Sequence, residues 1–223
     1  MERYATHGAL CALCLSSVAM SFPTAACAVV ISELLYDATG TDAGKVFVEL
    51  YGAPGTDLSG WSLRGVNGGD GSVYKTVNLS GIIPTDGVFV IGDLSSGTTL
   101  VPDADQIVSV DFQNGPDSVQ LYNGAALIDA LGYGDFTGLF FAGEGNAAPS
   151  TPSGSSLARI NPFIDTGDNL ADFAILATPT PGAVPGVTAV PLPASAWLLG
   201  SGLAMLGVRR RAREVSGSLC RSG

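Results

Sequence analysis

The sequence predicts an all-β fold in which two antiparallel sheets pack face to face. Short runs rich in Val, Ile, Phe and Tyr recur along the middle of the 223-residue chain, separated by Gly, Asp and Asn. Between the two termini, no stretch keeps a 3.6-residue hydrophobic period for three turns, so we expect little α-helix. Many short strands joined by turns favour a β-sandwich.

Eight apolar runs are expected to form the strands. The clearest pair is a hairpin in which Asn123-Gly124 separates two runs, because Asn and Gly tolerate positive φ. Further turn residues gather at 67–71 and 86–87. The expected strands are residues 29–36, 45–51, 60–66, 73–79, 87–91, 107–111, 118–122 and 125–133.

Residues 1–28 have the pattern of a secretory signal peptide. A basic start precedes a mostly apolar run over 9–20, and small residues lead up to Ala28. We therefore expect cleavage between Ala28 and Val29. Acylation of Cys27 is the less favoured alternative, because the residues before it lack the large aliphatic side chain of a lipoprotein motif.

The C-terminal segment is predicted to hold a single transmembrane helix over residues 189–208. These twenty residues include no ionisable side chain, and about twenty residues cross a hydrocarbon core of roughly 30 Å. The basic cluster after the span favours the cytoplasmic side, so the preceding chain should lie outside. A buried amphipathic helix is disfavoured because the segment has no polar face. A Pro motif, Pro191, Leu192 and Pro193, lies at the start of the span, and Arg209, Arg210 and Arg211 follow it.

The segment between the two ends is strongly acidic. Residues 29–190 contain four basic and eighteen acidic residues, a formal charge of −14. Nucleic-acid binding requires a field of Lys and Arg, so we expect no nucleic-acid partner. All four cysteines lie in the terminal segments, at Cys11, Cys14, Cys27 and Cys220, so no disulfide is expected in the domain.

The residue inventory argues against most catalytic classes. The single histidine, His7, lies in the expected signal peptide, which leaves the mature domain without imidazole or thiol. Serine and cysteine nucleophile systems and His/Cys zinc sites are thereby excluded. Paired carboxylates could still serve a glycosidase, but no catalytic motif marks any pair. We expect a protein that is not an enzyme and carries no cofactor.

Three acidic or aromatic features have structural interpretations that we favour. Trp61 is expected in the core rather than in a ligand site. Glu33 and Glu49 alternate with apolar neighbours and are expected in exposed ion pairs with Lys45 or Arg64. The alternatives are plain solvent exposure or a carboxylate pair at a sheet edge.

A calcium site is the one metal site that the acidic residues permit. Asp165, Asp168 and Asp172 place oxygens at short intervals, and Asp103 with Asp105 does so less fully. Neither stretch has the twelve-residue calcium loop, so a solvated acidic turn is favoured and no metal is expected. A recognition module would instead use exposed aromatic side chains, for which the candidates are Tyr133, Phe136, Phe140 and Phe141.

Two resemblances extend this interpretation. Residues 190–211 resemble the PEP-CTERM sorting signal of exopolysaccharide-producing Gram-negative bacteria, with Leu192 in place of the usual Glu and a longer tail. That resemblance implies processing by an exosortase near the Pro motif. Residues 29–185 are similar to lamin-tail domains in the Leu-Ser-Gly-Trp and Thr-Pro-Thr-Pro-Gly pieces, which implies an immunoglobulin-like sandwich without catalytic activity.

Together these features predict a three-part chain: a signal peptide over 1–28, a lamin-tail-like β-sandwich over 29–185, and a linker with sorting signal over 186–223. The expected function is that of a non-catalytic surface or matrix protein. It is exported, transiently anchored in the inner membrane, processed by exosortase and associated with exopolysaccharide or other surface proteins. The alternatives are a carbohydrate- or calcium-binding module and, less favoured, a carboxylate-based hydrolase.

Overall fold

The computed structural model describes residues 28–183. Nearly all of the expected signal peptide, the Pro motif Pro191-Leu192-Pro193, the 189–208 span and Arg209 to Arg211 lie outside the described residues. Within residues 28–183, no helix has the length and apolar character needed to cross a membrane.

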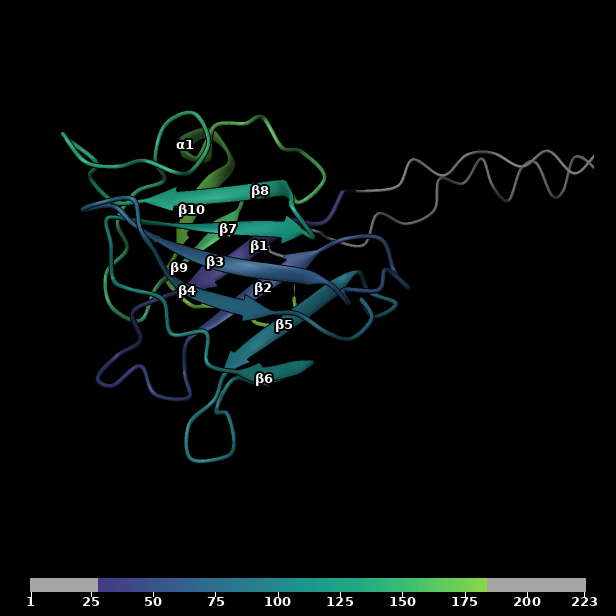
Figure 1. Cartoon of the computed structure of the whole chain (residues 1–223). Helices are drawn as coiled ribbons and strands as arrows, with labels where there is room; N and C mark the ends of the chain where they lie inside the picture. The colour runs from purple at the N-terminus through teal and green to yellow at the C-terminus, as the bar shows by residue number, and fades with distance from the viewer. Residues whose placement is uncertain (1–27, 184–223) are drawn as a thin grey trace, which may run out of the picture.

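The described chain forms two β-sheets, as predicted, with one four-residue helix (Figure 1). The larger sheet has the order β10-β9-β1-β2-β5-β6 and the smaller one the order β4-β3-β7-β8. The elements are β1 (Val30–Leu35), β2 (Phe47–Tyr51), β3 (Trp61–Asn67), β4 (Val73–Asn78), β5 (Val88–Asp93), β6 (Gln106–Val108), β7 (Asp117–Asn123), β8 (Ala126–Tyr133), β9 (Ser156–Arg159), α1 (Asn169–Asp172) and β10 (Phe173–Leu176).

All eight predicted runs overlap a strand, with bounds that differ by a few residues. The predicted hairpin joins β7 to β8, and Gly124 begins its two-residue loop with a φ of 58°, a conformation that glycine adopts at little cost. One feature of the prediction is wrong: the sheets are not wholly antiparallel, because β6 pairs parallel to β5. Strands β9 and β10 and helix α1 were not predicted.

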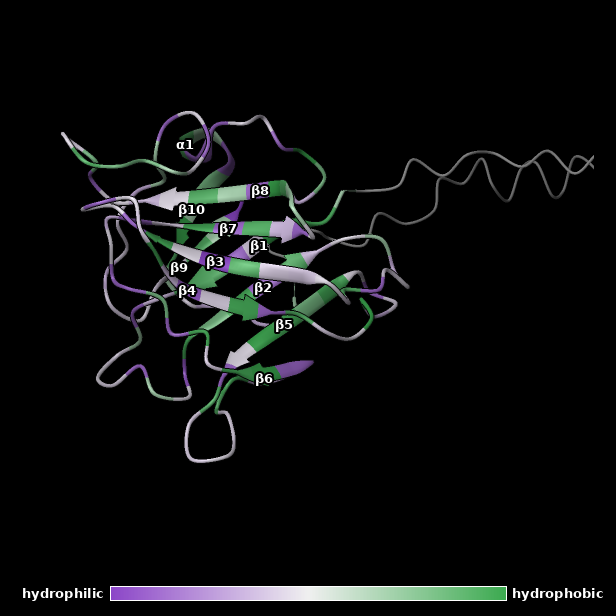
Figure 2. Ribbon diagram, viewed as in Figure 1, coloured by the Kyte–Doolittle hydropathy of each residue, from purple (hydrophilic) through white to green (hydrophobic). Residues whose placement is uncertain are grey.

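The main core lies between the two sheets. It joins Ile31, Leu50 and Ile91 of the larger sheet to Leu63 and Leu121 of the smaller one. Figure 2 shows hydrophobic residues along the strands of both sheets and mostly hydrophilic or neutral residues in the loops. The alternating strand patterns therefore form a two-layer sandwich.

The outer face of the larger sheet is covered as well. A second apolar cluster includes Leu35, Phe47, Val90 and Val101, with Val101 supplied by the loop between β5 and β6. The chain after β10 crosses this same face, and we call residues 178–182 the strap. Strands β1 and β5 are consequently buried along their whole length.

Candidate functional site

Two clusters of buried charged side chains lie inside the domain. The first surrounds Arg159, the last residue of β9, whose side chain is fully buried. Its Nη2 donates to both carboxylate oxygens of Asp129 on β8, at 3.1 and 2.9 Å, and its Nε donates to the Ile31 carbonyl at 3.0 Å. Because Asp129 belongs to the smaller sheet and Arg159 to the larger one, this ion pair links the two layers.

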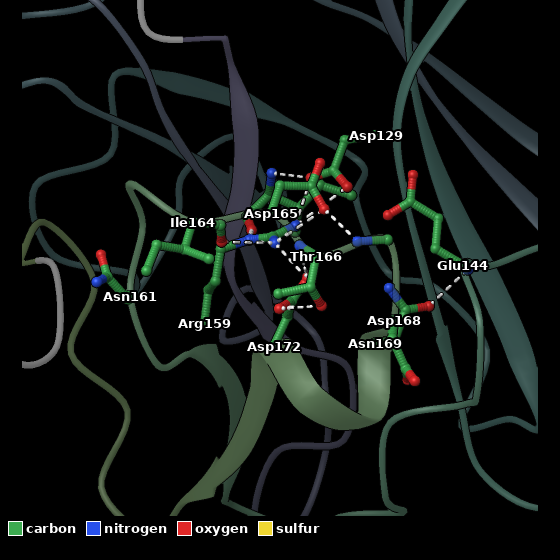
Figure 3. Close-up of polar contacts among 12 residues, drawn as sticks. Asp129, Glu144, Arg159, Asn161, Ile164, Asp165, Thr166, Asp168, Asn169 and Asp172 are labelled. Atoms are coloured by element: carbon green, nitrogen blue, oxygen red, sulfur yellow. Dashed lines mark hydrogen bonds and ion pairs between the residues drawn. The ribbon is translucent and has the colours of Figure 1, made fainter.

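The same guanidinium fixes the chain between β9 and α1. Arg159 Nη1 donates to Asp172 Oδ2 at 3.1 Å and to the Ile164 carbonyl at 3.4 Å (Figure 3). Asp172 in turn accepts from the backbone and the hydroxyl of Thr166, at 2.9 and 2.8 Å. The ring of Phe173 lies 4.6 Å from the guanidinium carbon. One buried arginine therefore holds the loop 160–168 against the sandwich.

The three aspartates of the expected calcium stretch, Asp165, Asp168 and Asp172, make different contacts. Asp168 caps α1 by accepting from Leu170 N, and it also binds Asn146, while Asp172 is paired with Arg159. Asp165 lies 3.6 Å from the Arg159 guanidinium. The structure therefore does not bring these three aspartates together as a ligand set.

A different set of acids converges beside Arg159. One carboxylate oxygen each from Asp129, Glu144 and Asp165 lies within 4.8 Å of the others. Burial, with Asp129 and Asp165 nearby, raises the pKa of Glu144 to about 7, and its buried Oε2 has no hydrogen-bond partner among the described residues. A hard cation needs six to eight oxygens. Here the Arg159 guanidinium already supplies the positive charge that Asp129 requires.

We therefore predict that calcium does not stabilise the protein specifically. Added calcium should change the melting temperature by no more than a small screening effect, because two of the three clustered acids, Asp129 and Asp165, already pair with Arg159. Thermal unfolding with calcium, with magnesium and in high salt measures this. A saturable rise that persists in high salt and is lost in Asp165→Asn would contradict the prediction.

The second polar cluster is a pair of glutamates beneath the strap. Glu33 and Glu49 are direct cross-strand partners on β1 and β2, and both are fully buried. The expectation of exposed ion pairs with Lys45 or Arg64 is wrong. The two acids do lie together, but in the centre of the larger sheet rather than at its edge.

Both glutamates bind the strap through its backbone. Glu33 Oε1 accepts from Ser156 Oγ at 2.5 Å and from Thr180 N at 3.0 Å, and its Oε2 accepts from Thr180 Oγ1 at 2.9 Å. Glu49 Oε1 accepts from Ser32 Oγ at 2.8 Å, and its Oε2 accepts from Gly182 N at 2.9 Å. All these partners are neutral donors, so within residues 28–183 the two carboxylates face each other without a compensating cation.

Strap residues also line two surface recesses. Pro179 and Pro181 line a mostly apolar recess of about 230 Å³ together with Phe47 and Val101. Gly182 borders a second, acidic recess of about 410 Å³, which is lined by Asp86, Asp103 and Asp105 among others. Asp105 Oδ2 accepts a hydrogen bond from the backbone N–H of Val90 at 2.8 Å. This recess can attract cations, but nothing among its lining residues is positioned as an acid–base pair on a bound group.

The glutamate pair should make the folded state more stable in mild acid. Burial, then Glu33 and Asp86, raise the pKa of Glu49 to about 7, and burial also raises the pKa of Glu33. Between pH 4.5 and 7 the folded protein thus binds more protons than the unfolded chain, so the free energy of unfolding falls as pH rises through this window.

Glu49→Gln should remove much of this pH dependence. The amide can still accept from Gly182 N and can donate to Ser32 Oγ, so the strap stays bound without a buried charge. We expect the variant to be more stable than wild type at pH 8 by on the order of 2 kcal/mol, and about equal at pH 5. Urea unfolding at both pH values measures the difference, and a parallel pH profile for the two proteins would contradict it.

The predicted aromatic binding residues are not gathered on one surface. Tyr133 is fully buried and stacks on Tyr36 with ring centroids 4.4 Å apart, which corrects its assignment as an exposed ring. Phe136 and Phe141 are half-buried and pack edge to face at 5.0 Å. Only Phe140 among the four is largely exposed.

The fold and these two clusters define a class: a two-sheet β-domain closed by a strap and cross-linked by a buried arginine. Comparison of the sequence with protein-family models and with curated proteins finds no match.

Proposed function

We propose that this chain is a non-catalytic exported protein, sorted by an exosortase and retained at the cell surface or in the exopolysaccharide matrix. The observation that carries the proposal is the position of the strap, which is the last described segment bound to the sandwich. Glu33 and Glu49 hold the strap as far as Gly182, and the Pro motif at 191–193 follows nine residues later in the sequence.

The immunoglobulin-like, lamin-tail nature of the domain is part of this proposal. Two pieces that carry the resemblance have defined structural roles, which supports it. Leu58 and Trp61 enter the core on either side of the turn into β3, and Thr180 and Gly182 are the strap residues bound by the glutamates. The acidic surface favours partners other than nucleic acid.

The test separates sorting from simple anchoring. Membrane insertion depends on hydrophobicity and flanking charge, whereas a processing enzyme must also recognise the chain at its cleavage site. We expect Pro191→Ala with Pro193→Ala to leave the chain inserted but unprocessed in a host that carries the enzyme. Pro185→Ala is the matched control, because it removes a nearby proline outside the motif.

The readouts are the intact mass of the mature protein and its presence at the surface. Changing Arg209, Arg210 and Arg211 to Ser should weaken orientation and retention before processing occurs. Normal mature mass and surface delivery of the Pro double variant would refute sorting and leave a plain tail anchor. The mass of the wild-type protein also tests cleavage between Ala28 and Val29.

A further inference from the structure

The loop after β9 presents an apolar surface to solvent. Ile160, Phe163 and Ile164 are 58%, 60% and 51% exposed, and residues 160–164 include no ionisable side chain. The one polar side chain, Asn161, accepts from the backbone N–H of Phe163 at 3.0 Å. We call Ile160, Phe163 and Ile164 the apolar loop residues.

The loop is held in place from the inside. Arg159 donates to the Ile164 carbonyl, and Ile164 N donates to the Asn161 carbonyl at 3.1 Å. In Figure 3, Asn161 and Ile164 lie on the side of the Arg159 network opposite to Glu144. The Phe163 ring packs edge to face with Tyr51 at 5.3 Å. The exposed side chains are therefore presented on a fixed backbone.

The loop lies beside the point where the strap leaves the domain. Tyr51 contacts Phe163, and Glu49, two residues earlier on the same strand, binds Gly182. Side chains two residues apart on a strand share a face and are about 7 Å apart. Val30 pairs with Tyr51, so the first strand also begins at this end of the sheet.

We propose that the apolar loop residues rest on the lipid surface while the chain is anchored by its tail. The proposal builds on the anchor in the proposed function. Only residues 184–188 separate the described domain from the expected span, and five extended residues reach at most about 18 Å. The end of the sandwich that carries the loop is thus held close to the headgroups, where clustered exposed apolar side chains are stabilised by burial.

The lack of charge in the loop favours zwitterionic lipid as its partner surface. Loop residues 160–164 offer no Lys or Arg to anionic headgroups, and the domain as a whole is strongly acidic. Lipid contact through these residues therefore depends on apolar burial, with no electrostatic attraction. We expect it to weaken as the fraction of anionic lipid increases.

The experiment places an environment-sensitive probe on the loop. In the full chain with Cys11, Cys14, Cys27 and Cys220 changed to Ser, Phe163→Cys is labelled with a nitrobenzoxadiazole dye and reconstituted into phosphatidylcholine vesicles. Phe140→Cys is the matched control because Phe140 is 61% exposed. Phe140 lies at the opposite end of the sandwich. Its N–H donates to the Gly68 carbonyl, directly after Asn67 at the end of β3. Through Asp117 of β7, Asn67 is aligned with Tyr133, which stacks on Tyr36 just after the last residue of β1, whereas Phe163 lies near the first residue of β1.

We expect brominated lipid to quench the probe at 163 at least twofold more than the probe at 140. If the protein resists carbonate extraction but both probes are quenched equally, the loop contact is refuted while the anchor stands. Extraction of the chain by carbonate would instead refute the anchor, and with it the loop proposal. Greater quenching in anionic than in zwitterionic vesicles would contradict the choice of partner surface.

Discussion

Arg159→Met is expected to lower the free energy of unfolding by about 3–5 kcal/mol, because it leaves buried carboxylates without their cation. Asp129 is fully buried and Asp172 nearly so, and both bind the Arg159 guanidinium at about 3 Å. Methionine fills much of the arginine volume, so the loss reports the missing charge and donors rather than a cavity. Urea unfolding at pH 7 measures the change.

Arg64→Met is the matched control. Arg64 stacks on the Tyr122 ring at 3.9 Å on the outer face of the smaller sheet and is only half-buried. Its loss should cost under about 1 kcal/mol. Adding Asp129→Asn to Arg159→Met should recover part of the stability, since it removes one unpaired buried charge. Equal losses for the two arginine variants would show that the network contributes no more than a surface contact.

The Arg159 network also connects stability to the proposed lipid contact. Its bonds run from the smaller sheet through β9 to the Ile164 carbonyl, so the cross-link between the layers is also what positions the apolar loop residues. A variant that loosens Arg159 should therefore free the loop before it unfolds the sandwich. Amide exchange over residues 164–166 that is faster in Arg159→Met than in wild type, with exchange over β2 changed less, would show this order.

The sequence predicted the strands whose signal is local. Alternating or continuous apolar runs bounded by turn residues located β1 to β5, β7 and β8, because each such strand shows its buried face in its own residues. Strand β9 lacked that signal. Its residues Ser156 and Arg159 are polar yet buried, and they are satisfied by Glu33 and Asp129, 123 and 30 residues away.

The glutamates were misassigned for a related reason. Glu49 on β2, and Glu33 on β1 after the bulge that follows Ile31, lie on the face opposite the core, which in a two-layer sandwich faces solvent. The strap covers that face, and its contact with Glu33 spans 147 residues of sequence. Tyr133 was misjudged in the same way, since the Tyr36 ring that stacks on it directly follows β1, a strand of the other sheet. Such partners are set by the tertiary fold and have no local pattern.

Trp61 is the residue for which local pattern and structure agree. The sequence placed it in the core because it lies between Leu58 and Leu63, and the structure buries all three side chains in the cluster between the sheets. Trp61 begins β3, where its backbone pairs with Asn123 on one side and its carbonyl accepts from Leu79 N at 2.9 Å on the other. The indole therefore lies in the core at the start of β3, where the backbone of β3 is bonded to β7 on one side and to the residue after β4 on the other.

Trp61→Ala should cost about 3–5 kcal/mol, because it removes the burial of a large ring and leaves a cavity between rigid sheets. Trp61→Phe keeps most of the apolar area and should cost less than half as much, which distinguishes lost packing from loss of a specific indole contact. Urea unfolding of the three proteins gives both differences, and an unchanged m-value would confirm that the same surface is exposed on unfolding. A Trp61→Ala protein that melts within a few degrees of wild type would contradict the buried position and return Trp61 to the candidate ligand-binding residues.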